Sequence, residues 1–126
     1  LYDPHALLYL PDVESDVHRF AIPVSLHGAD QQRDSGAHPS TWFSWSSTGL
    51  HLFEIDAGAN PSLTTSGVVD SDDVVDCWLG SDRAFINGSA VHYVHDGRVV
   101  SADWQQPHIT QDTVLRQEQH YCSLLD

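Results

Sequence analysis

A run of tight turns between short apolar segments, Arg83–Trp104, constrains the fold of this chain more than any other stretch. Asn87-Gly88 separates Ala84–Ile86 from Ala90–Val94, and Asn-Gly between two apolar runs predicts a two-residue hairpin loop, because both central residues of a type I′ turn have positive φ. Asp96-Gly97 repeats the pattern before the next apolar segment. The stretch therefore predicts three antiparallel strands joined by two tight turns, a meander typical of β-propeller blades, sandwiches and barrels.

Further strands are predicted where apolar segments are bounded by clusters of Gly, Pro, Asp, Asn and Ser. The predicted strands are 6–10, 18–25, 49–56, 63–69, 84–86, 90–94, 99–103 and 107–115. Pro23 lacks an amide donor, so we expect it at an edge or a bulge of its sheet. The polar segment Gly28–Ser40 predicts a long loop, and 116–126 is interpreted as a loop rather than a short helix.

These segments predict an all-β chain of two four-stranded antiparallel, blade-like sheets. A weak internal repeat supports the division, with an offset of about 46 residues, which falls within the period of four-stranded propeller blades. The repeat aligns Asp56, Pro61 and Thr64 with Asp103, Pro107 and Thr110. We expect the first sheet within 1–72, which includes the loop 28–40, the second within 73–116, and a tail over 117–126.

The charge balance limits the classes of partner. The chain has 18 acidic residues against five Arg and no Lys, a formal net charge of −13. This argues against nucleic acid, because phosphate binding needs clustered cations. No apolar run approaches the length of about 20 residues that spans a bilayer. Salt screens the repulsion within an acidic protein, which favours a saline setting, and we expect a secreted or extracellular protein.

The two cysteines, Cys77 and Cys122, lie far apart and form no C-x-x-C pair, which excludes a zinc-knuckle interpretation. A disulfide between them is one alternative, since paired cysteines are common in exported chains. Two buried free thiols are the other alternative.

Histidines provide one set of candidate metal ligands, and His92-x-x-His95 is the tightest grouping. Residues three apart on a strand point to opposite faces, so His92 and His95 share an ion only if a turn intervenes. The other interpretation is a pair of exposed hairpin histidines. His5, His18 and His51 lie next to predicted strands, which leaves their convergence in space open.

A second candidate metal site lies in the acidic segment 70–76, which reads DSDDVVD. It resembles a calcium loop in its carboxylates but lacks the Gly at the sixth position and the Glu at the twelfth that an EF-hand needs. A looser calcium site formed by Asp70, Asp72 and Asp76 is one interpretation, and a solvated turn between the two sheets is the other. No other cofactor is expected.

Catalytic motifs do not support an enzyme, because no G-x-S-x-G elbow or comparable nucleophile context is present. A metal-dependent hydrolase, or a metal- or calcium-binding protein that uses His and Asp side chains, remains the alternative function. The aromatic residues Trp42, Phe43 and Trp45 form either a recognition surface for carbohydrate or protein, or part of the packing within a sheet.

Three segments, His5–Pro11, Phe20–Val24 and Arg83–Asp103, together resemble the last two blades of a family of secreted bacterial and archaeal proteins with a C-terminal β-propeller domain. The most specific part is R-A-F-I-x-G from Arg83, followed by His92-Tyr93-Val94 and Val99–Asp103. The resemblance implies the C-terminal part of a β-propeller and a non-catalytic extracellular module for protein interaction or assembly. Because a ring has about four to eight blades, it also implies a fragment, or a subunit completed by other blades of a parent chain, by a partner chain or by self-association.

The same interpretation predicts exposed apolar surface on an isolated pair of sheets. Their outer faces would present strands such as 6–10 and 99–104, a patch larger than soluble monomers normally carry. The working surface of such a module is expected on loops such as Gly28–Ser40.

Overall fold

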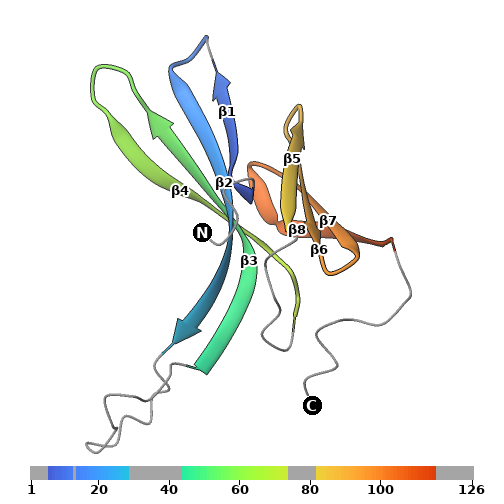
Figure 1. Ribbon diagram of the computed structural model, residues 1–126. Coiled ribbons are helices and arrows are strands. Elements are labelled where there is room, and N and C mark those ends of the chain that lie inside the picture. The colour runs from blue at the N-terminus through green and yellow to red at the C-terminus, as the bar shows by residue number, and fades with distance from the viewer. Residues whose placement is uncertain (1–5, 13, 29–43, 74–81, 116–126) are drawn as a thin grey trace, which may run out of the picture.

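The computed structural model describes residues 6–12, 14–28, 44–73 and 82–115, which form two four-stranded antiparallel sheets without an α-helix (Figure 1). The first sheet contains, in chain order, β1 (Leu8–Asp12), β2 (Val17–Gly28), β3 (Ser44–Asp56) and β4 (Ser62–Asp70). The second contains β5 (Arg83–Asn87), β6 (Ala90–His95), β7 (Arg98–Asp103) and β8 (Gln106–Val114). The predicted all-β class with two four-stranded sheets is therefore confirmed.

Three strands of the first sheet are longer than the sequence predicted, and the other, β1, is shifted. β1 starts at Leu8 and runs through Pro11 to Asp12, two residues later at each end than predicted, because its pairing with β2 continues there. β2 extends through Gly28 because it pairs with β3 along its whole length, so the predicted loop starts later, and 29–43 lies outside the described residues. β1 begins at Leu8, opposite Ala21, so at Pro23 the strand β2 pairs with β3 only, which is the edge position expected for proline.

The two predicted hairpin turns, which join β5 to β6 and β6 to β7, are of different types. Asp96-Gly97 has positive φ at both positions, 46° and 73°, as a type I′ turn requires. Asn87 pairs with Ala90, so the central residues of the other turn are Gly88 and Ser89, and only Gly88 has a positive φ, of 63°. The predicted type I′ turn centred on Asn87-Gly88 is therefore wrong. The φ pattern is that of a type II′ turn, which favours glycine at its first central position.

The two sheets pack face to face and share one core (Figure 1). The core consists of Ala21, Leu50, Leu52 and Val69 from the first sheet with Val91, Tyr93, Val100, Ala102 and Trp104 from the second. These side chains alternate along their strands with less buried ones, as in any sheet with one inner face. The expectation that 99–104 would be exposed is wrong, because Val100, Ala102 and Trp104 point inward.

Gly67 in β4 marks a close approach between the two sheets. Its φ is +127°, a conformation that side chains rarely adopt, and a Cβ atom added there would lie 2.6 Å from Cγ of Pro107 in β8. Gly67 therefore allows β8 to pack directly on the backbone of β4.

We expect the variant Gly67→Ala to lower the free energy of unfolding by about 2 kcal/mol, because it adds both backbone strain and a steric clash. Urea denaturation followed by circular dichroism measures the loss. The matched control is Gly28→Ala, since a Cβ atom at Gly28 would have nothing within 4 Å. Equal losses in the two variants would show that the contact with Pro107 is unimportant.

Candidate functional site

The outer face of the first sheet, turned away from the second sheet, carries a row of aromatic side chains. Tyr9, Phe20 and Phe53 lie side by side across β1, β2 and β3, and Thr65 of β4 follows them. The rings of Tyr9 and Phe20 stack with their centroids 4.9 Å apart. Ala21, next to Phe20, is fully buried in the core, and because strand residues alternate between faces, the rings point away from the core.

Two further rows of cross-strand partners extend this surface on either side of the aromatic row. We call the whole surface the outer apolar face. Its residues are Pro11, His18, Ile55 and Leu63 in one row, Tyr9, Phe20, Phe53 and Thr65 in the next, and Ile22, His51 and Val68 in the third. The side chain of Leu63 is 67% exposed and that of Tyr9 is 48% exposed, so no described residue covers this face.

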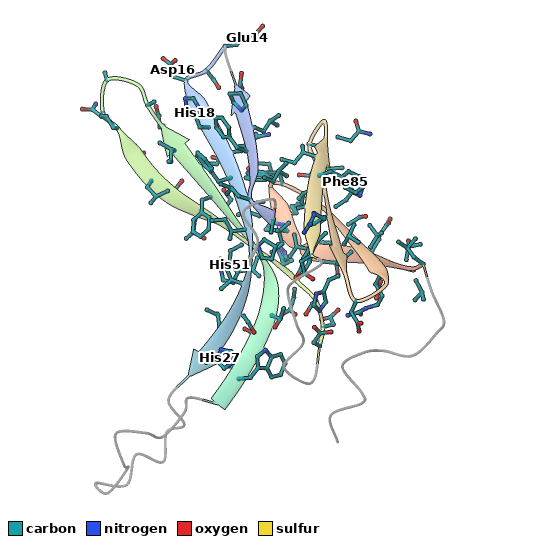
Figure 2. The ribbon with its side chains drawn as sticks, in the orientation of Figure 1. Glu14, Asp16, His18, His27, His51 and Phe85 are labelled. Carbon is teal, nitrogen blue, oxygen red and sulfur yellow. The ribbon has the colours of Figure 1, made fainter. Side chains whose placement is uncertain are left out.

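The outer apolar face carries no Asp, Glu, Lys or Arg, although the chain has a net charge of −13. Two histidines lie on its central strands (Figure 2). Nδ1 of His18 is 2.7 Å from the hydroxyl of Tyr9, and the ring of His51 stacks on Phe53 with centroids 6.5 Å apart. Burial lowers the pKa of His51 below its ordinary value, which favours the neutral ring.

The outer face of the second sheet is more polar. Phe85 stacks on His92 with centroids 4.6 Å apart, and Nδ1 of His92 lies 2.7 Å from Oγ of Ser101. The partner of Ser101 on β8 is the exposed Gln111. His92 and His95 occupy opposite faces of β6, as expected for residues three apart, so the structure does not bring these two candidate ligands together.

A row of charged side chains, Asp82, His95, Asp73 and Arg98, is buried between the two sheets. We call it the buried ionic chain, and His95 is at its centre. The side chain of His95 is only 1% exposed. Its Nδ1 lies 2.8 Å from Oδ1 of Asp82, and its Nε2 lies 2.6 Å from Oδ2 of Asp73. The interpretation of His95 as an exposed hairpin histidine is therefore wrong, because the alternation along β6 directs this residue into the core.

Arg98 in β7 extends this row of buried charged side chains towards the first sheet. It donates hydrogen bonds to Oδ1 of Asp73 at 3.0 Å and to the carbonyl of Ser71 at 2.6 Å. Ser71 in turn donates to the carbonyl of Thr48 in β3 at 2.8 Å. The segment that follows β4 is thus fastened to both sheets, and its interpretation as a solvated turn is wrong for Ser71 and Asp73.

Negative and positive charges alternate along Asp82, His95, Asp73 and Arg98. The hydrogen bonds of His95 to the two carboxylates depend on its positive charge. Burial alone would lower the pKa of His95, but its hydrogen bonds to Asp73 and Asp82 outweigh burial and raise that pKa to about 9. Both ring nitrogens donate only when the ring is protonated, so each carboxylate receives a hydrogen bond at neutral pH. The pKa of Asp73 is lowered because the hydrogen bond to His95 and the charges of His95 and Arg98 outweigh burial.

Tyr93 adds a neutral donor to the same network. Its hydroxyl lies 2.5 Å from Oδ2 of Asp82, and it donates this hydrogen bond. Burial and the neighbouring carboxylate of Asp82 raise the pKa of Tyr93, so the hydroxyl keeps its proton. The network is therefore a structural connection between the two sheets, in which Nε of Arg98 is the one buried side-chain polar atom of the described residues without a hydrogen-bond partner.

A second polar connection involves Trp104. Its Nε1 donates to Oε1 of Glu54 in β3 at 2.8 Å, and the guanidinium of Arg19 lies over its ring at 5.3 Å. Arg19 also donates to Glu54 at 3.3 Å. Two side chains of the first sheet thus hold Trp104 of the second sheet at the interface.

The other predicted site residues are not gathered into one place. Oδ1 of Asp70 accepts the amide of Asp72 at 2.8 Å, which closes a local turn. Nε1 of Trp45 donates to Oγ1 of Thr48 at 2.9 Å. The remaining residues, Trp42, Phe43, Asp76, Cys77 and Cys122, lie outside the described residues, so the disulfide stays a prediction. In the described ranges no three or more His, Cys, Asp or Glu side chains are arranged to hold a metal ion.

No protein-family model, curated protein or solved structure matches this chain. The part of the chain that the structure describes contains no helix long and apolar enough to cross a membrane. Within the described residues, the outer apolar face is a large apolar surface without a covering layer.

Proposed function

We propose that this chain is a non-catalytic interaction or assembly module of the β-propeller type that works in an extracellular setting, and that a further β-sheet packs on its outer apolar face. The observation that carries the proposal is the outer apolar face itself. A sheet with one apolar face needs one covering layer, whereas the first sheet is apolar on both faces and has a layer on only one. Exposed apolar patches of this kind mark interaction surfaces.

The arrangement of equivalent strands supports the propeller type. Each sheet is a four-stranded meander in chain order, and β1 contacts β5 while β4 contacts β8, so the first strands of the two sheets are neighbours and so are the last, as in adjacent propeller blades. Asp56 and Asp103, the first pair of the internal repeat, each end the third strand of their sheet. Each accepts a hydrogen bond from the backbone amide two residues ahead, at 2.9 Å for Asp56 and 2.8 Å for Asp103.

We expect the purified chain to associate beyond its monomer mass of 14.0 kDa at micromolar concentrations, and the variant Phe53→Asp to prevent association. An aspartate at Phe53 would place an unpaired carboxylate in an apolar interface, which is costly. Because Phe53 is partly buried, Thr65→Asp at an exposed position of the same face is the second variant. Light scattering over a concentration series measures the mass, and circular dichroism confirms that the variants are folded.

Phe85→Asp on the outer face of the second sheet is the matched control, and we expect it to leave association unchanged. A wild-type chain that remains a compact monomer at every concentration, with no affinity for further chains, would contradict the proposed function. Equal loss of association in Phe85→Asp and Phe53→Asp would move the docking surface away from the outer apolar face.

A further inference from the structure

We infer that the sheet that covers the outer apolar face is the same face of a second copy of this chain, and that protonation of His51 releases the pair. This inference rests on the proposed function, because it names the partner of the surface proposed there. It also specifies the symmetry: two first sheets meet about a two-fold axis, and the second sheets lie on the outside.

The absence of fixed charge on the outer apolar face is the first argument for a second copy. A partner that approached with a charged surface would lose water from groups that this face cannot pair with an opposite charge. Among the described residues, the other outer face, that of the second sheet, presents polar groups such as Arg83, Ser101 and Gln111. In a two-fold pair each outer apolar face meets an identical uncharged face, so the pair buries no Asp, Glu, Lys or Arg side chain.

The extent of the face indicates how strong the pair is. Four strands about 4.8 Å apart and three rows about 7 Å apart define roughly 400 Å² on each copy. A standard stable interface buries about 800 Å² on each partner, so this pair is weak and reversible. The chain's net charge of −13 adds repulsion between copies, which salt screens. A weak pair is one that a change in a single buried group can dissociate.

His51 is the group whose charge state changes within this interface. It lies on the central strand β3, and its cross-strand partners are Ile22 on β2 and Val68 on β4, neither of which titrates. Its own strand contributes the ring of Phe53. The carboxylate of Asp70 lies on the same side of the sheet, one row beyond Val68 at the exposed end of β4, and its Oδ1 already accepts the amide of Asp72 at 2.8 Å. A protonated His51 would therefore enter the interface with no anionic side chain directly across the sheet from it.

His18 is in a different environment and serves as the comparison. Its Nδ1 is already hydrogen bonded to the hydroxyl of Tyr9 at 2.7 Å. Its partners across the sheet are Pro11 on β1 and Ile55 on β3. The acidic residues Glu14 and Asp16 lie in the turn beyond it (Figure 2). His18 therefore lies at the edge of the outer apolar face, close to acidic residues.

The direction of the pH effect follows from which form the interface accepts. Association requires neutral His51, so the paired state binds fewer protons than the free chains, and a fall in pH favours the free chains. Burial already lowers the pKa of His51 in the single copy, and a second sheet about 10 Å away would bury it further. Each pair contains two copies of this histidine, so release takes up protons at two sites.

Sedimentation equilibrium on the full chain tests the inference, at about pH 7.5 and at about pH 5, which bracket the titration of histidine. In roughly 0.3 M salt we expect a monomer–dimer equilibrium. Its association constant should be lower by about tenfold or more at the lower pH. His51→Gln should dimerise at both pH values, because glutamine is a polar side chain of similar size to histidine that takes up no proton. His18→Gln should keep the pH dependence of the wild type.

Each other outcome has a distinct meaning. A pH dependence that persists in His51→Gln, or its absence from the wild type, would overturn the role of His51. Assemblies larger than two copies that Phe53→Asp abolishes would overturn the two-fold pair and leave the proposed function standing. A monomer at every concentration and both pH values would overturn the inference and the proposed function together.

Discussion

Replacing His95 by alanine is expected to lower the free energy of unfolding by about 3 to 5 kcal/mol. The imidazolium ring is the shared donor of two buried carboxylates, and among the described residues its loss leaves Asp73 with Arg98 as its charged partner and Asp82 with the hydroxyl of Tyr93. An uncompensated buried charge is among the costliest changes in a protein interior. Because small domains are stable by only about 5 to 15 kcal/mol, the variant should be close to unfolded. Urea denaturation followed by tryptophan fluorescence measures the loss.

His92→Ala is the matched control, since His92 lies on the same strand but on the opposite, half-buried face. We expect it to cost about 1 kcal/mol for the hydrogen bond to Ser101 and the contact with Phe85. Adding Asp82→Asn to His95→Ala should recover part of the loss, because it removes the carboxylate that lacks a counter-charge. Similar losses in His92→Ala and His95→Ala would mean that the buried ionic chain does not stabilise the fold.

The strands and their order were predictable because the signals for them are local. Asp96-Gly97 and Gly88-Ser89 sit in tight turns whose backbone geometry selects glycine, and the flanking apolar segments are short enough to exclude helices. The error at Asn87 has the same origin. Asn-Gly and Gly-Ser both fit a two-residue loop, and the pairing of Asn87 with Ala90, which depends on the whole sheet, decides between them.

The buried ionic chain was not predictable from spacing, because its members come together only when the two sheets pack. Asp73 follows β4 and Asp82 precedes β5, and neither carries a local motif. The alternation of β6 did indicate that His95 is buried. Val91 and Tyr93 point inward, and His95, two residues further along the strand, points to the same face. A histidine on the inner face of a strand needs a hydrogen-bond partner, and the sequence did not indicate which residues would supply it.

The outer apolar face was partly visible in the sequence. The segment Phe20–Val24 is apolar at consecutive positions rather than alternate ones, a pattern typical of strands covered on both faces. The exposure of the strand 6–10 was expected, and Leu7, Tyr9 and Leu10 are indeed exposed. The expectation that 99–104 is exposed was wrong, because apolar content alone does not say which face of a strand meets the core.

The stability of the folded chain is expected to fall as the pH rises from about 6.5 to about 9, by about 3 kcal/mol. The folded state raises the pKa of His95 from its ordinary 6.5 to about 9, so the folded chain holds a proton that the unfolded chain has released in this range. The contribution is complete below the unfolded value and is lost as the pH passes the folded value. Above it, a neutral ring donates to only one of Asp73 and Asp82.

Urea denaturation at a series of pH values measures this slope, and His95→Gln is the variant that isolates it. Glutamine takes up no proton, so a folded His95→Gln chain should have lower stability at neutral pH and little change between about pH 6.5 and about pH 9. At the acid end the lowered pKa of Asp73 acts in the opposite sense, because its contribution is lost as the pH falls. The alkaline loss in the wild type is therefore separate from the acid release proposed for His51. A wild-type stability that stays constant up to about pH 9 would mean that His95 is neutral in the fold, and that one of its two hydrogen bonds to carboxylates is absent.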